Sequence, residues 1–346
     1  MKGKKLRVFH GLVNYGTQAG FFAKELRNQG VDAISIVNPD IYKRLTDIEL
    51  KHGGSIIQKM YRHSINLLLK ISSIFKYDIY HFYFGTTLLP KQTDLYFYKL
   101  LGKKIIFHYL GNDVQGYKIS VEKYKWTNMP GFIGNSNPYE YDDRIKRRLN
   151  HETKYADLQF VCAPCYSEFV PNSVVLPLAI DLEHYNFIGH PGNKIPKIFH
   201  APTDLAFKGT TYIEEAIEKL KHEGYSFIYQ RITGVNHAEL KLKYAECDIF
   251  IDQIMGGWYG TAAIEAMAIG RPVICSIRKS YFEYIDYGDE IPIIHADPDC
   301  IYDSIKLLLD NPAMLAEIGK SSRLFVESQH DVKKLTQKLI TIYNNL

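Results

Sequence analysis

The sequence predicts an α/β protein built from two doubly wound domains, each a parallel sheet with helices on both faces. Three observations support this fold class. Short apolar runs of strand length alternate with amphipathic helical segments. The alternation starts again after a polar, Pro- and Gly-containing linker at 190–196. The length of 346 residues suits two domains of ordinary size.

The first half begins with an apolar run, Leu6–His10, which predicts a buried strand. A Gly-containing loop follows at 11–20, and Phe21–Gln29 has the pattern of a helix that ends at Gly30. Short apolar runs between helices favour parallel strands with both faces covered. Further strands are expected at Ala33–Val37, Ile79–Phe84, Lys104–Tyr109, Leu158–Val161 and Val174–Leu176.

The second half repeats this alternation. Strands are expected at Lys197–His200, Ser226–Gln230, Ile249–Asp252 and Pro272–Ser276, with helices at Thr211–His222, Leu240–Ala245 and Ala262–Ile269. The last segment, Val332–Asn345, has apolar residues at helical spacing and predicts an amphipathic helix. We therefore expect an N-terminal domain at 1–189, a C-terminal domain at 190–330, and a helix at 331–346 that packs back toward the N-terminal domain.

Charge is distributed unevenly along the chain. Residues 1–180 hold 25 Lys/Arg and 15 Asp/Glu, a net charge of +10, whereas residues 181–346 hold 17 and 23, a net charge of −6. A basic half indicates an anionic surface or substrate. The five cysteines do not suggest a disulfide framework, the N-terminal apolar run is too short for a signal peptide, and no 18-residue apolar run occurs. The expected location is the cytoplasm.

The most informative stretch runs from Asp248 to Ile274 and has the pattern strand, Gly-rich loop, helix, strand. Gly260 and Thr261 open the helix, where unpaired backbone N–H groups and the positive end of the helix dipole can bind a diphosphate. Glu265 follows Thr261 by one helical turn and lies on the same face, so its carboxylate can accept bonds from two ribose hydroxyls. The alternative is a structural helix with a surface glutamate.

The run from Glu265 to Ile274 reads EAMAIGRPVI. It resembles the donor-binding segment of retaining GT-B glycosyltransferases of family 4, which reads E-A-M-A-x-G-x-P-V-I. The resemblance implies the GT-B fold, in which two Rossmann-like domains face each other across a cleft. It implies that the domain at 1–189 binds the acceptor and that the domain at 190–330 binds the nucleotide sugar. It also implies that Glu265 holds the ribose of the nucleotide.

The loop before this helix departs from the family pattern. The family has a second glutamate eight residues before the first, and that position here is Gly257. The donor sugar would then be contacted by backbone amides or by Asp252 or Gln253. By the same resemblance, the loop and helix start contribute four donor-binding positions, which are Gly257, Tyr259, Gly260 and Thr261.

A second segment, Ile198–Thr210, resembles the first strand-loop-helix of the family's donor domain. Lys208 and Gly209 match the Lys-Gly that neutralises the diphosphate, so Lys208 is expected both to bind the donor and to assist catalysis. The family's arginine falls near Thr203, which we retain as a donor-site position. A solvated lysine is the structural alternative. Gly234 lies in the segment that matches the family's base-binding loop, with His237 as a further candidate.

The N-terminal half contributes three candidates. Gly16 lies in the loop that resembles the family's mobile Gly loop. Asp113 matches the aspartate of the family's His-Gly-x-Asp, but Leu110 occupies its histidine position. His108 lies two residues earlier on the same strand face. It either substitutes for that histidine in catalysis or is a core histidine.

Two segments outside these motifs require interpretation. Asp297-Pro298-Asp299 precedes the helix expected at Tyr302–Leu309, and we interpret its carboxylates as a helix cap. No metal site, essential metal or cofactor is predicted besides the donor cosubstrate. Ile56–Lys76 mixes apolar and basic residues, which suits either a core helix or a helix that rests on an anionic membrane surface.

Together these features predict a retaining glycosyltransferase of the hexosyltransferase type. A UDP-sugar is the favoured donor and a GDP-sugar remains open, with a glycan or lipid-linked acceptor in cell-surface polysaccharide assembly and peripheral membrane association. One alternative is a sugar-nucleotide epimerase or hydrolase on the same fold. Another is a non-catalytic accessory subunit, because Gly257 and Thr203 replace family residues. No nucleic-acid-binding module is recognisable.

Overall fold

The computed structural model describes residues 6–40 and 42–346 and divides the chain into two compact units. Unit 1 comprises the chain up to Gln115, Asp143–Ala179 and Val332–Leu346. Unit 2 comprises Gly116–Asp142 and Ile180–Asp331. The segment Gly116–Asp142 lies inside the range 1–189 that the sequence suggested for the N-terminal domain, and its contacts place it with unit 2.

Unit 1 contains a parallel sheet of seven strands in the order β3-β2-β1-β4-β5-β6-β7. The strands are β1 (Arg7–Leu12), β2 (Asp32–Val37), β3 (Ile48–Glu49), β4 (Ile79–Tyr83), β5 (Lys104–Tyr109), β6 (Leu158–Val161) and β7 (Val174–Val175). The helices of this part of the chain are α1 (Gln18–Asn28), α2 (Ile56–Lys76), α3 (Leu95–Leu100), α6 (Pro138–Tyr155) and α13 (Val332–Asn344).

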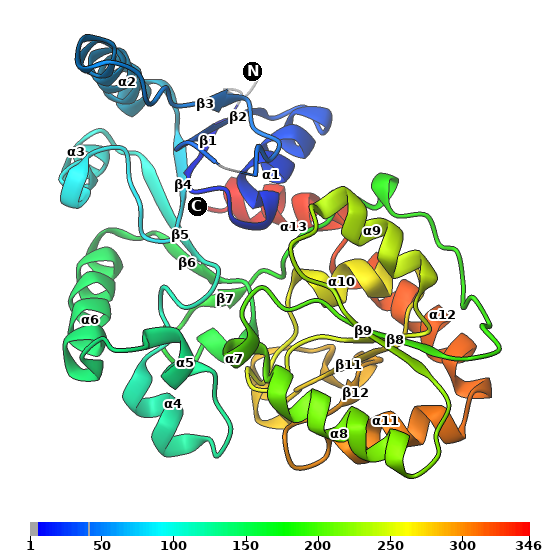
Figure 1. Cartoon of the computed structure of the whole chain (residues 1–346). Coiled ribbons are helices and arrows are strands. Elements are labelled where there is room, and N and C mark those ends of the chain that lie inside the picture. The colour runs from blue at the N-terminus through cyan, green and yellow to red at the C-terminus, as the bar shows by residue number, and fades with distance from the viewer. Residues whose placement is uncertain (1–5, 41) are drawn as a thin grey trace. The chain divides into compact units, whose positions relative to one another are not determined.

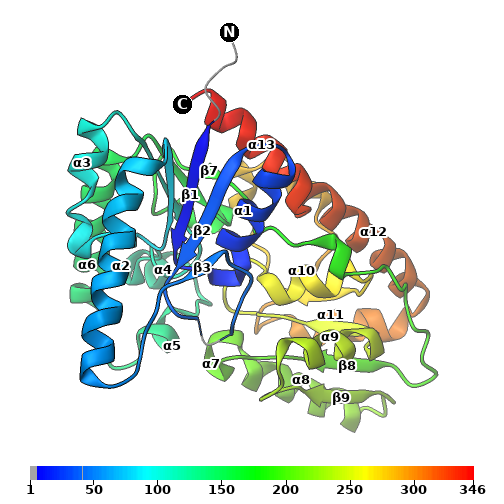
Figure 2. The same ribbon diagram turned by 90° about the horizontal axis from the view of Figure 1, so that it is seen from above.

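Alternate strand residues build two apolar layers in unit 1. Phe9, Tyr80 and Phe107 point to the face that carries α2, α3 and α6. Val8 and Ile106 point to the opposite face, where they pack with α1 and α13. Figures 1 and 2 both show α1 and α13 side by side on that face.

Unit 2 contains a parallel sheet of five strands in the order β12-β11-β10-β8-β9. The strands are β8 (Lys197–His200), β9 (Ile228–Arg231), β10 (Ile249–Ile251), β11 (Val273–Cys275) and β12 (Ile294–His295). Its helices are α4 (Tyr117–Lys123), α5 (Met129–Ile133), α7 (Leu205–Lys208), α8 (Thr210–His222), α9 (His237–Glu246), α10 (Thr261–Ala268), α11 (Ile301–Asp310) and α12 (Ala313–Gln329). Helices α8 and α11 cover one face, and α9, α10 and α12 cover the other (Figure 1).

These two sheets confirm the predicted fold class, two doubly wound α/β units. Each sheet has a point where the strand order reverses, between β1 and β4 in unit 1 and between β8 and β10 in unit 2. In open parallel sheets, ligands bind beyond the carboxyl ends of the strands at this point. The segments that follow β8 and β10, and those that follow β1 and β4, are therefore the places to look for sites.

Candidate functional site

The reversal point of unit 2 brings together Lys208 and the loop Asp252–Gly260. Lys208 ends α7, which follows β8, and Asp252 directly follows β10. The Lys208 Nζ lies 2.5 Å from Asp252 Oδ1, and the two side chains are 11% and 2% exposed. Lys208 is therefore largely buried and paired with a carboxylate, whereas the structural alternative from the sequence was a solvated lysine. Its ammonium is held at a fixed position beside the helix α10.

Helix α10 presents an uncapped N-terminus at the same point. Gly260 is its N-cap, contributes no side-chain cap, and the first turn holds no acidic residue. The Gly260 N–H donates to Asp252 Oδ2 at 3.1 Å. Asp252 therefore links the lysine to the start of the helix, which begins at Thr261 and receives no cap from the side chain of its N-cap residue. A helix N-terminus of this kind suits an anion.

Glu265 lies one turn into α10 and is nearly buried. Its Oε1 accepts the Tyr185 hydroxyl at 2.9 Å and the His237 Nε2–H at 2.7 Å. Since a carboxylate only accepts, the imidazole must donate through Nε2. The Lys241 ammonium lies 3.9 Å from the centroid of the Tyr185 ring and adds positive charge nearby. The carboxylate is thus held in one orientation.

The segment expected to bind the base lies beside Glu265 through His237. Gly234 has φ 70° and is exposed, and it precedes α9, whose N-cap Asn236 forms a capping box with Glu239. His237 is the first residue of this helix, so the capping box sets the direction of its side chain. The structure therefore brings the Gly234 loop, His237 and Glu265 together within unit 2.

Gly257, at the position of the family's other glutamate, is required by its surroundings. Its φ is 75°, and a Cβ there would lie 2.3 Å from Arg278 Nη1. The Arg278 guanidinium donates to the carbonyls of Met255 and Trp126 and to the Tyr281 hydroxyl, and it stacks 3.9 Å from the centroid of the Tyr124 ring. An arginine therefore occupies the space beside the donor loop that a glutamate side chain would need.

Two other predicted donor positions differ in how they face solvent. The Tyr259 side chain is buried and its hydroxyl pairs with His330 Nε2 at 3.0 Å, so it anchors the loop from the interior and only its backbone is available to a ligand. Thr203 is exposed after β8, beside Asp204, whose carboxylate caps α7 through the Phe207 N–H.

The candidates of unit 1 lie in a different environment. His108 is fully buried at the end of β5, and its Nδ1 lies 3.2 Å from His81 Nε2. Burial lowers the pKa of His108 to about 3, so the ring is neutral. This placement matches the core-histidine alternative rather than direct contact with a donor sugar.

Asp113 and Gly16 follow β5 and β1. The Asp113 Oδ1 accepts the Gly111 N–H at 2.9 Å, and Oδ2 has no hydrogen-bond partner among the described residues. Burial raises the pKa of this carboxyl to about 7. Gly16 has φ 53° in the short loop between β1 and α1, and its carbonyl accepts the Gln18 side-chain amide.

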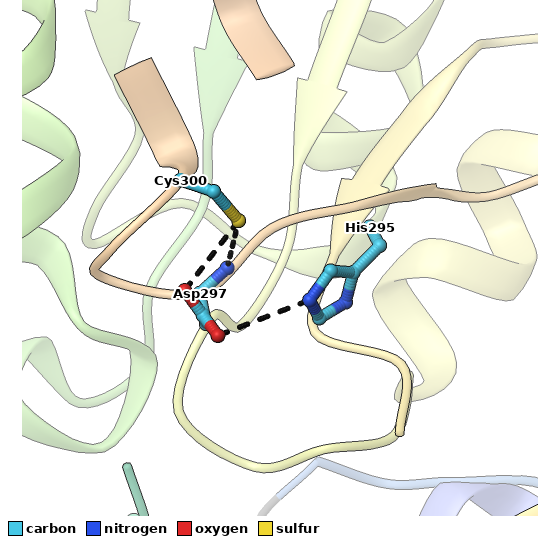
Figure 3. A group of neighbouring side chains, drawn as sticks. All are labelled: His295, Asp297 and Cys300. Atoms are coloured by element: carbon cyan, nitrogen blue, oxygen red, sulfur yellow. Dashed lines mark hydrogen bonds and ion pairs between the residues drawn. The ribbon is translucent and has the colours of Figure 1, made fainter. Parts of the chain in front are cut away.

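One group in unit 2 has metal-ligand chemistry, formed by His295, Asp297 and Cys300 (Figure 3). The His295 Nδ1 accepts the Ile277 N–H at 3.1 Å, so in the neutral ring Nε2 carries the proton and points at Asp297, 3.9 Å away. An Nε2 that carries a proton cannot ligate a cation. The contacts of this group are those of a turn, and the prediction of no essential metal stays a prediction.

The predicted cap on the following helix was wrong. The N-cap of α11 is Cys300, without a side-chain cap bond. The Asp299 carboxylate instead accepts the Lys125 ammonium and the Trp126 N–H, both at 2.8 Å or less. These partners lie in the Gly116–Asp142 segment, more than 170 residues away in sequence. A local capping pattern could not reveal them.

Sequence reasoning also missed Tyr185 and Arg278. Tyr185 lies 80 residues from Glu265, and Arg278 lies 152 residues from Trp126. Neither belongs to a recognisable motif. The presence of Gly257 in place of a glutamate was the one signal that another side chain fills this space.

The two parallel α/β units and the loop-helix site at the reversal point of unit 2 define the GT-B class of fold. HepE of Anabaena, solved with UDP and glucose, aligns over 99% of this chain and 100% of its own, with TM-score 0.63 and 12% identity. Sucrose-phosphate synthase from Thermosynechococcus elongatus aligns over 99% of both chains, with TM-score 0.61 and 12% identity. A UDP-N-acetylglucosamine 2-epimerase aligns over 99% and 97%, with TM-score 0.52 and 13% identity.

These likenesses establish the fold, and the GT-B expectation is confirmed. No protein-family model matches the chain, and no curated protein matches it by sequence.

Proposed function

We propose that this protein is a retaining glycosyltransferase that moves a hexosyl unit from a nucleotide diphosphate sugar to an acceptor bound mainly by unit 1. The observation that carries the proposal is the group formed by Lys208, the open N-terminus of α10 and Glu265. A cation and free amides suit a diphosphate, and a fixed carboxylate one turn away suits a ribose.

A UDP-sugar is the donor we favour, and a GDP-sugar is the second choice. HepE, a structure of similar fold, was solved with UDP and glucose and also with UDP-glucose. In the reaction, Lys208 and the amides of α10 stabilise the negative charge that builds on the departing diphosphate. The diphosphate in turn accepts the acceptor's proton, and the new bond keeps the anomeric configuration.

The binding step is tested by calorimetry with UDP-glucose and a panel of UDP-, GDP- and ADP-sugars. We expect Glu265→Gln to weaken binding of the recognised donor about tenfold or more, because a neutral amide loses charge-assisted bonds to the ribose. Glu317→Gln is the matched control, since Glu317 is exposed on α12. Failure of every sugar nucleotide to bind would contradict the proposal.

The chain is also similar in fold to a UDP-N-acetylglucosamine 2-epimerase, which supports a second candidate function, that of a sugar-nucleotide epimerase or hydrolase. Incubation with the donor alone separates the three activities. An epimerase forms a new sugar nucleotide, a hydrolase releases free sugar, and a transferase forms neither at a comparable rate until an acceptor is added. If the protein is a non-catalytic accessory subunit, the wild type should show no turnover, and the Glu265→Ala variant should still bind its partner.

The acceptor side of the proposal concerns membranes. No helix in residues 6–40 and 42–346 is long and apolar enough to cross a bilayer. Helix α2, however, exposes Ile57, Met60, Leu68 and Phe75 at helical spacing, with basic residues between them. We propose that this face rests on an anionic membrane and that the protein acts on a glycan or lipid-linked acceptor in cell-surface polysaccharide assembly.

A further inference from the structure

Unit 1 contains a cavity at its own strand-reversal point. The cavity has a volume of about 590 Å³ and is lined by the ends of β1 and β2, by residues 85–92 after β4, and by side chains of α2 and α6. This volume is in the range of small-ligand sites. All of the lining residues belong to unit 1, and none of them is among the residues assigned above to the donor.

The charges around the cavity all have one sign. Lys70, Lys91, Arg147 and Arg148 line it, and no aspartate or glutamate does. Arg148 lies 3.6 Å from the Glu152 carboxylate and donates to the Phe84 carbonyl. Lys70, Lys91 and Arg147 form no ion pair with a carboxylate of the described residues. Lys91 and Arg147 are exposed, whereas Lys70 is half-buried.

Lys70 is the most informative of these cations. It lies on α2, is half-buried, and burial lowers its pKa while Asp94 partly opposes the effect. A half-buried ammonium without a direct carboxylate partner costs free energy, because it has lost water without gaining a counter-charge. An anion bound in the cavity would remove that cost.

The loop that forms the wall of the cavity holds an uncommon backbone. Phe84, Lys91 and Gln92 have φ values of 53°, 54° and 59°, three of the six positive values found for non-glycine residues in the described chain. A side chain at Gly85, which has φ 59°, would be strained and would have to displace the ends of Glu152 and Arg148, because its Cβ would lie 2.3 Å from Glu152 Oε1 and 2.6 Å from Arg148 Nη1. Backbone of this kind costs free energy and is concentrated at ligand sites.

We propose that this cavity binds a phosphate or diphosphate group of the acceptor. Three cations without carboxylate partners match the charge and the several acceptor oxygens of a phosphate ester better than the single charge of a carboxylate. The identification of the ligand as the acceptor rests on the proposed transferase function. The binding of a phosphate in the cavity is argued from residues of unit 1 alone. It names the acceptor's chemical class as a phosphorylated sugar or lipid.

Inorganic pyrophosphate is the probe, titrated by calorimetry into the full chain. Lys70→Gln and Arg147→Gln should each weaken its binding about tenfold, the loss of one charge-assisted bond. Lys59→Gln, exposed on α2, and Lys146→Gln, exposed next to Arg147, are matched controls that should stay within about twofold of the wild type. Lys208→Gln measures any pyrophosphate bound in unit 2. Equal binding by the cavity variants and their controls would overturn the inference.

Competition then identifies the source of the phosphate. Displacement of pyrophosphate by vesicles of phosphatidylcholine and phosphatidic acid, but not by phosphatidylcholine alone, indicates a lipid headgroup. Displacement by hexose 1-phosphate indicates a soluble sugar phosphate. Displacement by either competitor supports the site. If neither competitor displaces pyrophosphate, the inference is overturned. Donor binding measured on the same cavity variants keeps the two proposals apart, because it should be unchanged if unit 2 holds the donor.

Discussion

Asp113 shows how one buried carboxyl links structure to pH. Its pKa is raised to about 7 in the folded chain, against an ordinary value of 3.8. Between these two values the folded state binds more protons than the unfolded state, so this group makes stability fall as pH rises. The loss of folding stability caused by ionising Asp113 reaches its full size above about pH 7.

Asp113→Asn should therefore raise the melting temperature at pH 8 and change it little at pH 4, where the native carboxyl is already protonated. The free-energy gain at pH 8 should reach a few kcal/mol at most. Thermal unfolding across this pH range measures it, with Asp143→Asn as an exposed control. A parallel pH dependence in both variants would show that Asp113 ionises normally.

Gly257 is the residue where this chain departs most clearly from the resemblance. Gly257→Ala should destabilise unit 2 by about 1–3 kcal/mol, because φ 75° is unfavourable for alanine and its Cβ would displace Arg278. Denaturant unfolding measures the loss. Gly224→Ala is the control, since Gly224 has φ 90° with open space around it, so it should lose only the backbone part.

At the residue level, the sequence could single out only those candidates whose signal lies in neighbouring positions of the chain. Glu265, Gly260 and Lys208 were identifiable because the motif and the helix start are local. Their partner Tyr185 could not be identified from the sequence, and Asp252 was only one of several alternatives for a sugar contact. Both contacts depend on how distant segments pack.

At the scale of elements, the apolar runs identified nearly every strand to within about two residues. The predicted strand Lys104–Tyr109 and helix Ile56–Lys76 have the bounds of β5 and α2. The short helices α3, α4, α5 and α7 were not predicted. The longer helices α6 and α12 were not predicted either, because α6 is rich in charge and α12 lacks a capping pattern at its start. Their helical state depends on packing against the units.

Helix α2 has the reverse of the usual arrangement, since much of its apolar surface faces outward. Leu68 and Ile71 are 68% and 42% exposed. Replacing both with serine should reduce flotation with vesicles of phosphatidylcholine and phosphatidylglycerol about tenfold or more, because apolar side chains supply much of the interfacial binding energy. The melting temperature should hardly change.

Leu324→Ser is the control for this prediction, as Leu324 is 65% exposed on α12. Salt should weaken vesicle binding of the wild type as well, since the basic residues of α2 contribute through screened charge. Wild-type protein that does not float would exclude the membrane role of this face.

At the scale of the molecule, three histidines join the sheet of unit 1 to its last helix. His10, His81 and His108 come from adjacent strands, and the Tyr343 hydroxyl of α13 lies 2.7 Å from His81 Nδ1. Burial lowers the pKa of His10 and His108 to about 3, and it also lowers the pKa of His81 well below its ordinary value. The stability that these neutral rings provide is present above pH 6.5 and is lost as pH falls below it.

Unfolding at pH 5.5 should therefore take up protons at these sites. His81→Gln should lower the uptake by nearly one proton, measured by calorimetry in buffers of different ionisation enthalpy. His222→Gln, on an exposed surface of α8, is the control variant for this measurement.

The division of charge is sharper by unit than by sequence half. Unit 1 holds 25 Lys/Arg and 12 Asp/Glu, a net charge of +13, and unit 2 holds 17 and 26, a net charge of −9. The sequence-based division gave smaller values because it counted the C-terminal helix, which holds three lysines and no acidic residue, with the second half of the chain. The Gly116–Asp142 segment holds three basic and three acidic residues, so its placement changes neither value. Only packing shows to which unit such segments belong.

The membership of α13 in unit 1 has a consequence for biosynthesis. Val332, Leu335, Leu339 and Tyr343 cover apolar surface of α1 and of the first strands, yet they are translated after the whole of unit 2. While the ribosome makes residues 180–331, that surface of unit 1 stays uncovered. Unit 2 can therefore complete its folding first, although unit 1 begins the chain. Until α13 emerges from the ribosome, the nascent protein exposes an apolar face that a chaperone can bind.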